Sequence, residues 1–404
     1  MIDIKLSRPR IEKSRERVEA VWNLEEPDRV PFTCEIGAEA EAPPRPDCLT
    51  LAPPCVRNKS TRMPPINYFT RDPEDMLRVQ LRNIETHLMF PYDDYIPALD
   101  PAFGVSVVPS AFGCQILYPD SFWDLKRDPI VEPILRKAAD VENLVRPDPY
   151  TDGLMPRVLQ TIDYWRQQVG GKIPVALTDS EGVLGDALMM RGTSGLLLDM
   201  YREPGLVHKL MNLLTETLIE WFLVQKDHAG QELDEGYCWG TWIPKGKGGA
   251  FMGDDGAAYL SPHLYEKFVA PYDSKVLGRF KGGLIHWCGD ATQNYKNFLR
   301  IPHCTGFHVD AMGHLDALAE LKKISDKHVI TCGDSPLDIE NYWKDAIRLC
   351  AIHGGFIARD FSASFTKCGT ARKGGYTSIV RKSQLEIAQC LTKVFSKYGK
   401  YPLR

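Results

Sequence analysis

The segment GGLIHWCGD, residues 282–290, has the residue types best suited to bind a metal ion. It reads as a buried strand, and side chains two residues apart on a strand point to the same side. His286 and Cys288 should therefore project together, while Trp287 faces away. An imidazole and a thiolate side by side provide two of the ligands that zinc prefers. The structural alternative is a buried thiol beside a hydrogen-bonded histidine.

A catalytic zinc site needs a third protein ligand and keeps a fourth position open. Three more cysteines lie at or after expected strand ends, namely Cys34, Cys332 and Cys368. A set of one histidine and two cysteines favours zinc because its ligands are soft. Zinc deprotonates a coordinated thiol and acts as a Lewis acid on oxygen, so the chemistry expected here is activation of a thiol or of an oxygen-bound group.

The elements that must position these residues alternate along the chain from about residue 153. Short apolar runs alternate with segments that have apolar residues at the i, i+3, i+4 and i+7 spacing of a helix. This alternation predicts a parallel sheet with helices outside it. The apolar runs are residues 172–182, 232–240, 282–290, 305–311, 328–334 and 354–360, and residues 30–37 form an earlier first strand.

Each of these runs begins apolar and ends in polar, chemically capable residues, as in a TIM barrel, where catalytic groups come from the C-terminal ends of several strands. A doubly wound sheet would concentrate the site at one switch point, and no GxGxxG sequence follows a strand here. The sequence therefore predicts one (β/α)8 barrel domain over residues 1–404. An N-terminal helix within residues 1–24 and a proline-rich loop or lid insertion at residues 42–65 extend it, and the eighth strand is expected within residues 95–120.

Two acidic residues near strand ends are candidates for catalysis. Glu181 could serve as a carboxylate on the substrate side or as an extra metal ligand, and a solvated loop acid is the alternative. Asp310 could orient His286 as a hydrogen-bond partner, or it could bind a loop amide.

Four further residues are candidates for substrate binding. Tyr237 and Trp239 could line an aromatic pocket, or they could pack under a long loop. Asp254 and Asp255 could contact substrate, or they could cap the helix that SPHLYEKF predicts.

Composition and charge exclude several classes of protein. The net charge of −4 argues against a nucleic-acid-binding surface, which would be basic. No apolar run approaches the roughly 20 residues that span a bilayer, and the charged N-terminus lacks a secretory signal. The 11 cysteines are an odd number, so they cannot all pair within the chain. These features predict a cytoplasmic protein in a reducing compartment, without nucleic-acid or membrane partners.

Several stretches together resemble the uroporphyrinogen decarboxylase-like superfamily, from about residue 174 to the C-terminus. The likeness is carried by residues 252–272, by LIHWCGD, by VITCGDSPLDI at 329–339 and by residues 354–369, together with EEPDRVPF at 25–32. Decarboxylases of this superfamily have an arginine-rich segment after the first strand, where this chain reads CEIGAEAEAPP. The resemblance therefore points to the cobalamin-dependent methyltransferase branch, which includes methylcobalamin:coenzyme M enzymes.

This branch binds zinc through a His-x-Cys pair and a distant cysteine. The resemblance assigns these roles to His286, Cys288 and Cys368, with Cys332 as the alternative third ligand because the loop around Cys368 departs from the family pattern.

The resemblance implies a zinc-dependent methyltransferase that moves a methyl group between cobalamin and a small substrate, either a methoxylated compound or a thiol. No DxHxxG cobalamin-binding motif occurs in this chain, so cobalamin is expected on a partner corrinoid protein. The alternatives are a uroporphyrinogen decarboxylase-type enzyme and a zinc-dependent epoxide:thiol transferase of the same superfamily. The methyl donor or acceptor, the direction of transfer and a homodimeric state are left open.

Overall fold

The computed structural model describes residues 6, 8–34, 73–88, 92–117, 130–310, 314–325, 327–334, 336, 338–351, 354–360 and 384–401. The chain forms two compact units. The first contains residues 1–58, 77–97 and 306–404, and the second contains residues 59–76 and 98–305. The proline-rich insertion expected at residues 42–65 and the predicted ligand Cys368 lie outside the described residues.

The first unit is built on parallel strands in the order β1-β10-β9-β8. Cys34 lies opposite Asp360, and Asp360 lies opposite Asp334, so three strands end in register with polar residues. All residues of β9 and β10 are buried, as expected of parallel strands that are covered on both faces. The strands are β1 (Phe32–Cys34), β8 (Cys304–Val309), β9 (Val329–Asp334) and β10 (Phe356–Asp360).

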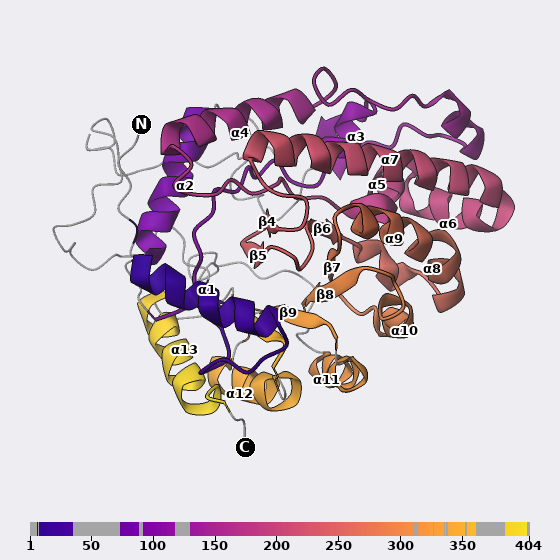
Figure 1. Ribbon diagram of the computed structural model, residues 1–404. Helices are drawn as coiled ribbons and strands as arrows, with labels where there is room; N and C mark the ends of the chain where they lie inside the picture. The colour runs from indigo at the N-terminus through magenta and orange to yellow at the C-terminus, as the bar shows by residue number, and fades with distance from the viewer. Residues whose placement is uncertain are drawn as a thin grey trace. The chain divides into compact units, whose positions relative to one another are not determined.

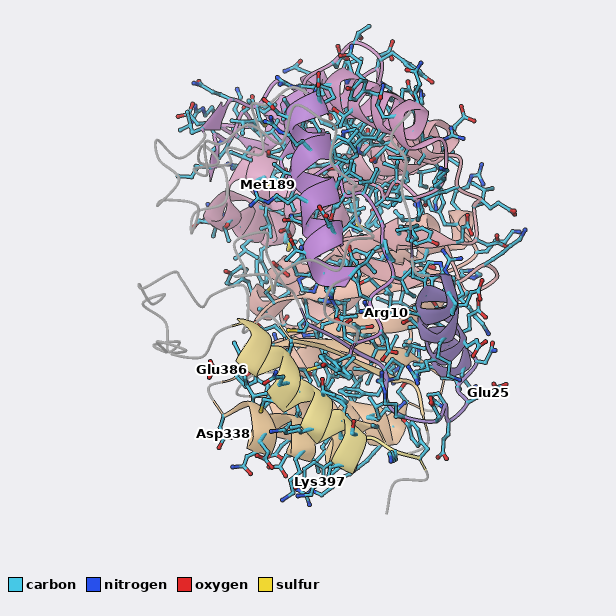
Figure 2. The ribbon with its side chains drawn as sticks, turned by 90° about the vertical axis from the view of Figure 1, so that its left-hand side faces the viewer. Arg10, Glu25, Met189, Asp338, Glu386 and Lys397 are labelled. Atoms are coloured by element: carbon cyan, nitrogen blue, oxygen red, sulfur yellow. The ribbon has the colours of Figure 1, made fainter. Side chains whose placement is uncertain are left out.

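Helices pack against these strands. α12 packs against α11 and α13, and α13 packs against β1, where Phe32 stacks on Phe395 with ring centroids 4.3 Å apart (Figure 1). Figure 2 shows α13 running from Glu386 near its start to Lys397 near its end. The helices here are α1 (Arg8–Trp22), α11 (Leu315–Ile324), α12 (Ile339–Cys350) and α13 (Gln384–Tyr398), and α2 (Pro73–Leu88) includes residues of both units.

The second unit is rich in helices arranged around α7 (Pro204–Ala229). This helix has Pro204 in its first turn and ends at Gly230, whose left-handed conformation is typical of a helix terminus. It packs against α4, α5, α6 and α9, and Figure 1 shows it beside α4. The other helices are α3 (Val107–Ala111), α4 (Met155–Val169), α5 (Gly182–Arg191), α6 (Thr193–Arg202), α8 (Pro262–Phe268), α9 (Ala270–Arg279), α10 (Tyr295–Phe298), and the 3-10 helices η3 (Ala138–Asn143), η4 (Asp255–Tyr259) and η5 (Thr292–Asn294).

Short strands in this unit position the candidate site. β6 (Ala250–Gly253) and β7 (Gly283–Trp287) pair in parallel, with Gly253 opposite His286. β4 (Gly236–Cys238) and β5 (Thr241–Ile243) form an antiparallel hairpin, and β2 (Ile116–Leu117) pairs antiparallel with β3 (Ile130–Val131).

The parallel pairing confirms the predicted mixed α/β class, with six strands in parallel ladders. Pairing that closes a barrel is not detected among the described residues. Among the described residues, the run expected as a strand at 172–182 makes only single parallel bridges, Leu99 with Val175 and Leu177 with Cys238. Within residues 95–120, the strand β2 pairs with β3 in an antiparallel way and does not join the parallel strands. The valine pair within residues 95–120, which suggested a strand, instead lies in helix α3. No helix in the described part of the chain is both long and apolar enough to cross a membrane.

Candidate metal centre

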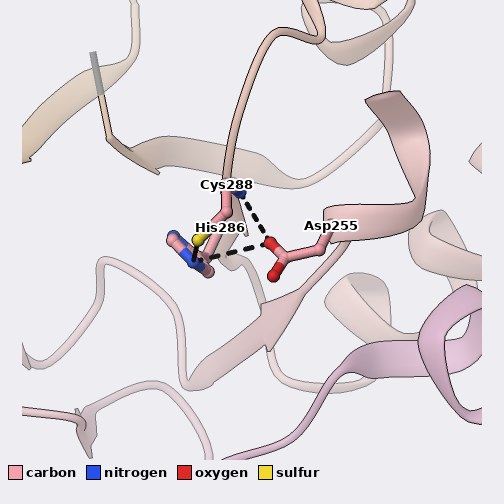
Figure 3. A group of neighbouring side chains, drawn as sticks. All are labelled: Asp255, His286 and Cys288. Atoms are coloured by element: carbon pink, nitrogen blue, oxygen red, sulfur yellow. Dashed lines mark hydrogen bonds and ion pairs between the residues drawn. The ribbon is translucent and has the colours of Figure 1, made fainter. Parts of the chain in front are cut away.

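His286 and Cys288 project together from the end of β7, as the two-residue period of a strand predicts. All five residues of β7 are buried, and Trp287 packs on Phe298 with ring centroids 4.5 Å apart. The His286 Nε2 atom lies 3.2 Å from the Cys288 Sγ atom (Figure 3). The His286 side chain is only 11% exposed, whereas Cys288 is exposed, so the pair is open to solvent on the side of the thiol.

Asp255 joins this pair from the start of η4. Its Oδ1 atom accepts a hydrogen bond of 2.6 Å from the Cys288 backbone N–H and lies 3.6 Å from His286 Nε2. Figure 3 shows the three side chains converging, and one ligand atom from each lies within 4.8 Å of the others. An imidazole nitrogen, a thiol sulfur and a carboxylate oxygen are ligands that zinc accepts, so this donor set fits the ion. Sequence reasoning assigned Asp255 to substrate binding, and the structure places it with the metal-ligand candidates.

Asp254 lies on the buried side of the same turn. Its backbone N–H donates to the His286 carbonyl at 2.7 Å, which fixes the end of β6 against the end of β7. The Tyr265 hydroxyl contacts the carboxyl groups of both Asp254 and Asp273, the latter at 3.0 Å. One hydroxyl hydrogen cannot be donated to two carboxylates at once, so this group is best satisfied when one carboxyl is protonated. Burial, followed by the charge of Asp273, raises the pKa of Asp254 well above its usual range, and burial raises the pKa of Asp273 to about 7.

Two aromatic rings lie beside His286. The centroid of the Trp239 ring is 5.2 Å from that of His286, and the centroid of the Phe251 ring is 6.4 Å from it. Trp239 occupies the turn between β4 and β5 with a φ of 45°, a left-handed conformation that costs a residue other than glycine about 1–2 kcal/mol. The other predicted aromatic residue, Tyr237, is buried and stacks on Trp242.

Glu181 lies immediately before α5, where a carboxylate favours the helix N-terminus. Its charge contributes to raising the pKa of Asp254, so its carboxylate is close to the buried side of the metal-ligand turn.

The remaining cysteine and aspartate candidates belong to the first unit. Cys332 is fully buried, and its thiol donates a hydrogen bond of 2.9 Å to Asp334. Burial, and next the neighbouring Asp334 charge, raise the pKa of this thiol, which makes it a poorer metal ligand. Asp310 is partly exposed, and its carboxyl is hydrogen-bonded to that of Asp334. Cys34 is buried, and its backbone N–H donates to Asp93.

Sequence reasoning missed three buried polar residues of the second unit, namely Tyr265, Asp273 and Asp186. Asp186 gave a weak signal, since an acid within the apolar run GVLGDALMM breaks the pattern of a buried helix face. The contacts of Tyr265 had no sequence signal, because they depend on how α8 and α9 pack.

Comparisons with known proteins agree with this fold. Residues 57–234 match the family model for uroporphyrinogen decarboxylase (URO-D). A solved methyltransferase from Methanosarcina mazei shares the fold, with a TM-score of 0.64 and 17% identity, over 95% of this chain and 98% of that chain.

The curated relatives include several uroporphyrinogen decarboxylases. The enzyme of Syntrophotalea carbinolica is 29% identical over 167 residues, which are 39% of this chain and 43% of that protein. The enzyme of Ovis aries is 26% identical over 219 residues, which are 53% of this chain and 52% of that protein. The chain thus spans about half the length of the curated relatives that it matches.

The family match confirms the resemblance to the uroporphyrinogen decarboxylase-like superfamily, and the shared fold agrees with it. The extent of the likeness differs from the prediction. The family model begins at residue 57, whereas the sequence stretches that suggested the likeness lie before and after the matched range.

Proposed function

We propose that this protein is a zinc-dependent methyltransferase that works with a separate corrinoid protein. In this proposal it moves a methyl group between cobalamin and a small substrate, either a methoxylated compound or a thiol. The observation that carries the proposal is the convergence of His286, Cys288 and Asp255 at one exposed edge. The fold shared with a methyltransferase supports it.

His286 Nε2, Cys288 Sγ and an oxygen of Asp255 would hold the zinc ion, and Cys368 remains a predicted further ligand. Zinc bound there would supply Lewis-acid chemistry, lowering the pKa of a coordinated thiol or polarising a coordinated oxygen. The exposed side of Cys288 gives substrate a direction of approach, and the rings of Trp239 and Phe251 would limit where it binds. Asp254 would keep the His286 strand end in place through its backbone hydrogen bond.

The second candidate is a uroporphyrinogen decarboxylase, because the family model and the curated relatives have that activity in their names. The electrostatics of the site disfavour it. Asp254 feels the negative charges of Asp273, Asp255 and Glu181, and such an acidic surrounding repels a substrate with many carboxylates.

Metal content tests the proposal directly. Freshly purified protein should contain about one zinc ion per chain, and His286→Ala and Cys288→Ala should each lose most of it. Cys304→Ala serves as the matched control, since Cys304 is a buried cysteine outside the cluster. Wild-type protein that contains and binds no zinc would refute the proposal.

The reaction itself is tested by absorption spectroscopy. Protein, cob(I)alamin and a panel of methoxylated compounds should yield methylcobalamin, or methylcobalamin and a thiol should yield cob(I)alamin. Release of carbon dioxide from uroporphyrinogen without added metal would favour the decarboxylase. Thiol addition to an epoxide without any corrinoid would favour the epoxide:thiol transferase.

A further inference from the structure

Three polar side chains lie buried on one face of the strands β8, β9 and β10. His308 and Thr331 are each 1% exposed, and Arg359 is 4% exposed. His308 lies opposite Thr331 in the strand register, and Arg359 lies opposite Gly333, two residues after Thr331. Residues in register, and residues two apart on one strand, point to the same side of a sheet. The three side chains therefore share one face.

The opposite face of these strands packs against α12. The Asp360 Oδ2 atom accepts a hydrogen bond of 2.6 Å from the indole N–H of Trp343. The Tyr342 hydroxyl donates to the carboxyl of Asp334, and the Cys332 thiol donates to the same carboxyl at 2.9 Å. These residues alternate along β9 and β10 with the first three side chains, which therefore face away from α12.

The guanidinium of Arg359 reaches across β9 to His308. Its Nη1 atom lies 3.3 Å from His308 Nε2, although β9 separates β10 from β8 in the sheet. Gly333, which lies opposite Arg359, has no side chain to obstruct this crossing. A guanidinium only donates hydrogen bonds, so His308 Nε2 accepts and the imidazole ring is neutral. The pair therefore brings one positive charge into the interior of the protein, and His308 adds no negative charge to it.

The hydroxyl of Thr331 is a second, independent indication of a ligand. Its Oγ1 atom is buried and has no hydrogen-bond partner within the described residues. Burying a hydroxyl group without a partner is unfavourable, so most buried hydroxyl groups of native proteins have one. This hydroxyl and the buried guanidinium lie on the same face, and both can donate hydrogen bonds to one oxyanion.

The position of this face also suits a ligand. Arg359 is the fourth of the five residues of β10, and His308 is the fifth of the six residues of β8. Both lie near the carboxyl ends of parallel strands, where α/β proteins bind their ligands. Thr33 of β1 lies opposite Arg359 and is partly exposed, so the face is not sealed at β1.

We propose that Arg359 and Thr331 bind the carboxylate of a small organic anion at this face, and that His308 holds the guanidinium in place. The fork of N–H groups on a guanidinium matches the two oxygens of a carboxylate, and the Thr331 hydroxyl would donate to one of them. One positive charge favours a ligand with one negative charge over a phosphate group, whose charge is about −1.5 to −2 at pH 7. The proposal concerns residues of the first unit alone and goes beyond the proposed function.

Isothermal titration calorimetry of the full-length protein tests the site. Benzoate should bind to wild type at one site per chain, and benzyl alcohol, which has the ring without the charge, should bind about 10-fold or more weakly. Arg359→Met should weaken benzoate binding about 10- to 100-fold, the usual effect of losing a hydrogen bond to a charged group. Arg359→Lys keeps the charge but loses the fork, so it should weaken binding by a smaller factor.

Two controls separate this site from other causes of binding. Arg348→Met removes the same charge from an exposed position on α12, where the arginine pairs with Asp345, and it should leave benzoate binding unchanged. Wild type treated with a chelator should also keep benzoate binding, which distinguishes a carboxylate held by Arg359 from one held by a metal ion.

Three outcomes of the titrations would contradict the proposal. Wild type that binds no benzoate, or binds it no more tightly than Arg359→Met does, would show that the guanidinium is structural. Loss of benzoate binding on chelator treatment would assign the carboxylate to a metal ion. Tighter binding of inorganic phosphate than of benzoate would overturn the choice of a carboxylate.

Thr331→Val keeps the proposal testable if substitution of Arg359 prevents folding. Valine has the shape of threonine without its hydroxyl, so the midpoint temperature of unfolding without ligand should stay the same or rise. The variant should bind benzoate about 3- to 10-fold more weakly than wild type does.

The matched control is Thr215→Val. Thr215 is also buried, but its hydroxyl donates to the Met211 carbonyl at 2.7 Å. This variant should therefore lower the unfolding temperature and keep benzoate binding. If Thr331→Val lowers the unfolding temperature as Thr215→Val does, or leaves the affinity for benzoate unchanged, the role of Thr331 in the site is wrong.

Discussion

The pair of buried acids next to the candidate metal centre, Asp254 and Asp273, predicts an unusual dependence of stability on pH. The pKa of Asp273 in the folded protein is raised from 3.8 to about 7, mainly by burial, so the folded state binds a proton that the unfolded state releases. Stability should therefore fall as pH rises from about 4 through about 7. Asp273→Asn removes the titrating group and keeps an amide oxygen that can accept from Tyr265.

The size of the effect follows from the shift. A difference of about 3 pKa units corresponds to about 4 kcal/mol for an isolated group. Because Tyr265 links the carboxyls of Asp273 and Asp254, the proton is shared, and we expect a difference on the order of 2–4 kcal/mol between wild type and the variant. The relative stability of Asp273→Asn should increase by that amount between about pH 4 and about pH 8.

Urea unfolding of the metal-free proteins, followed by circular dichroism across this pH range, measures the effect. Asp316→Asn is the control, because Asp316 is an exposed acid in the first turn of α11, and its curve should run parallel to that of wild type. Parallel curves for wild type and Asp273→Asn would show that neither buried acid keeps its proton, and the reasoning from burial would then be refuted.

Three further results are expected. Trp239→Asn should preserve the free energy of unfolding or raise it by up to about 1–2 kcal/mol, because asparagine tolerates the left-handed turn, and it should raise KM for substrate. Thermal unfolding and steady-state kinetics measure these two effects. A loss of stability with KM unchanged would show that the Trp239 ring serves packing alone. Removal of zinc with a chelator should lower the unfolding temperature, and zinc at about 100 times its Kd should restore about 2.7 kcal/mol, as followed by calorimetry. His286→Ala should abolish that response and Cys304→Ala should keep it, whereas an equal response in both would place the ion elsewhere.

Local sequence patterns predicted the part of the site that depends on local geometry. The two-residue period of a strand was sufficient to bring His286 and Cys288 together. Asp255 was predicted as a substrate contact and not as a metal-ligand candidate. Its hydrogen bond to Cys288 joins residues 33 positions apart and depends on how β6 and β7 pair. No local pattern encodes such a contact.

The fold shows the same division between local and distant information. Long amphipathic or apolar runs such as α7 and β9 formed the predicted kinds of element. The shorter run around Val107 and Val108 forms helix α3, because tertiary packing decides the structure of a short valine-rich segment. Trp239 is another case, since asparagine or glycine is the usual residue in its turn, and its contact with the distant His286 ring has no signal in the local sequence.

The space that Gly185 and Gly253 leave for Glu181 has a consequence for how this protein can change during evolution. A side chain at Gly185 would lie 2.3 Å from the Glu181 Cβ atom, and a side chain at Gly253 would meet the backbone of residues 180 and 181 at 3.1 Å as well as the Glu181 carboxylate. Relatives that keep an acid at position 181 should therefore keep both glycines, whereas loss of the acid alone would not free Gly253, because its backbone contacts stay. Joint variation of positions 181 and 185 would therefore separate relatives that keep this carboxylate in place from relatives that share only the fold.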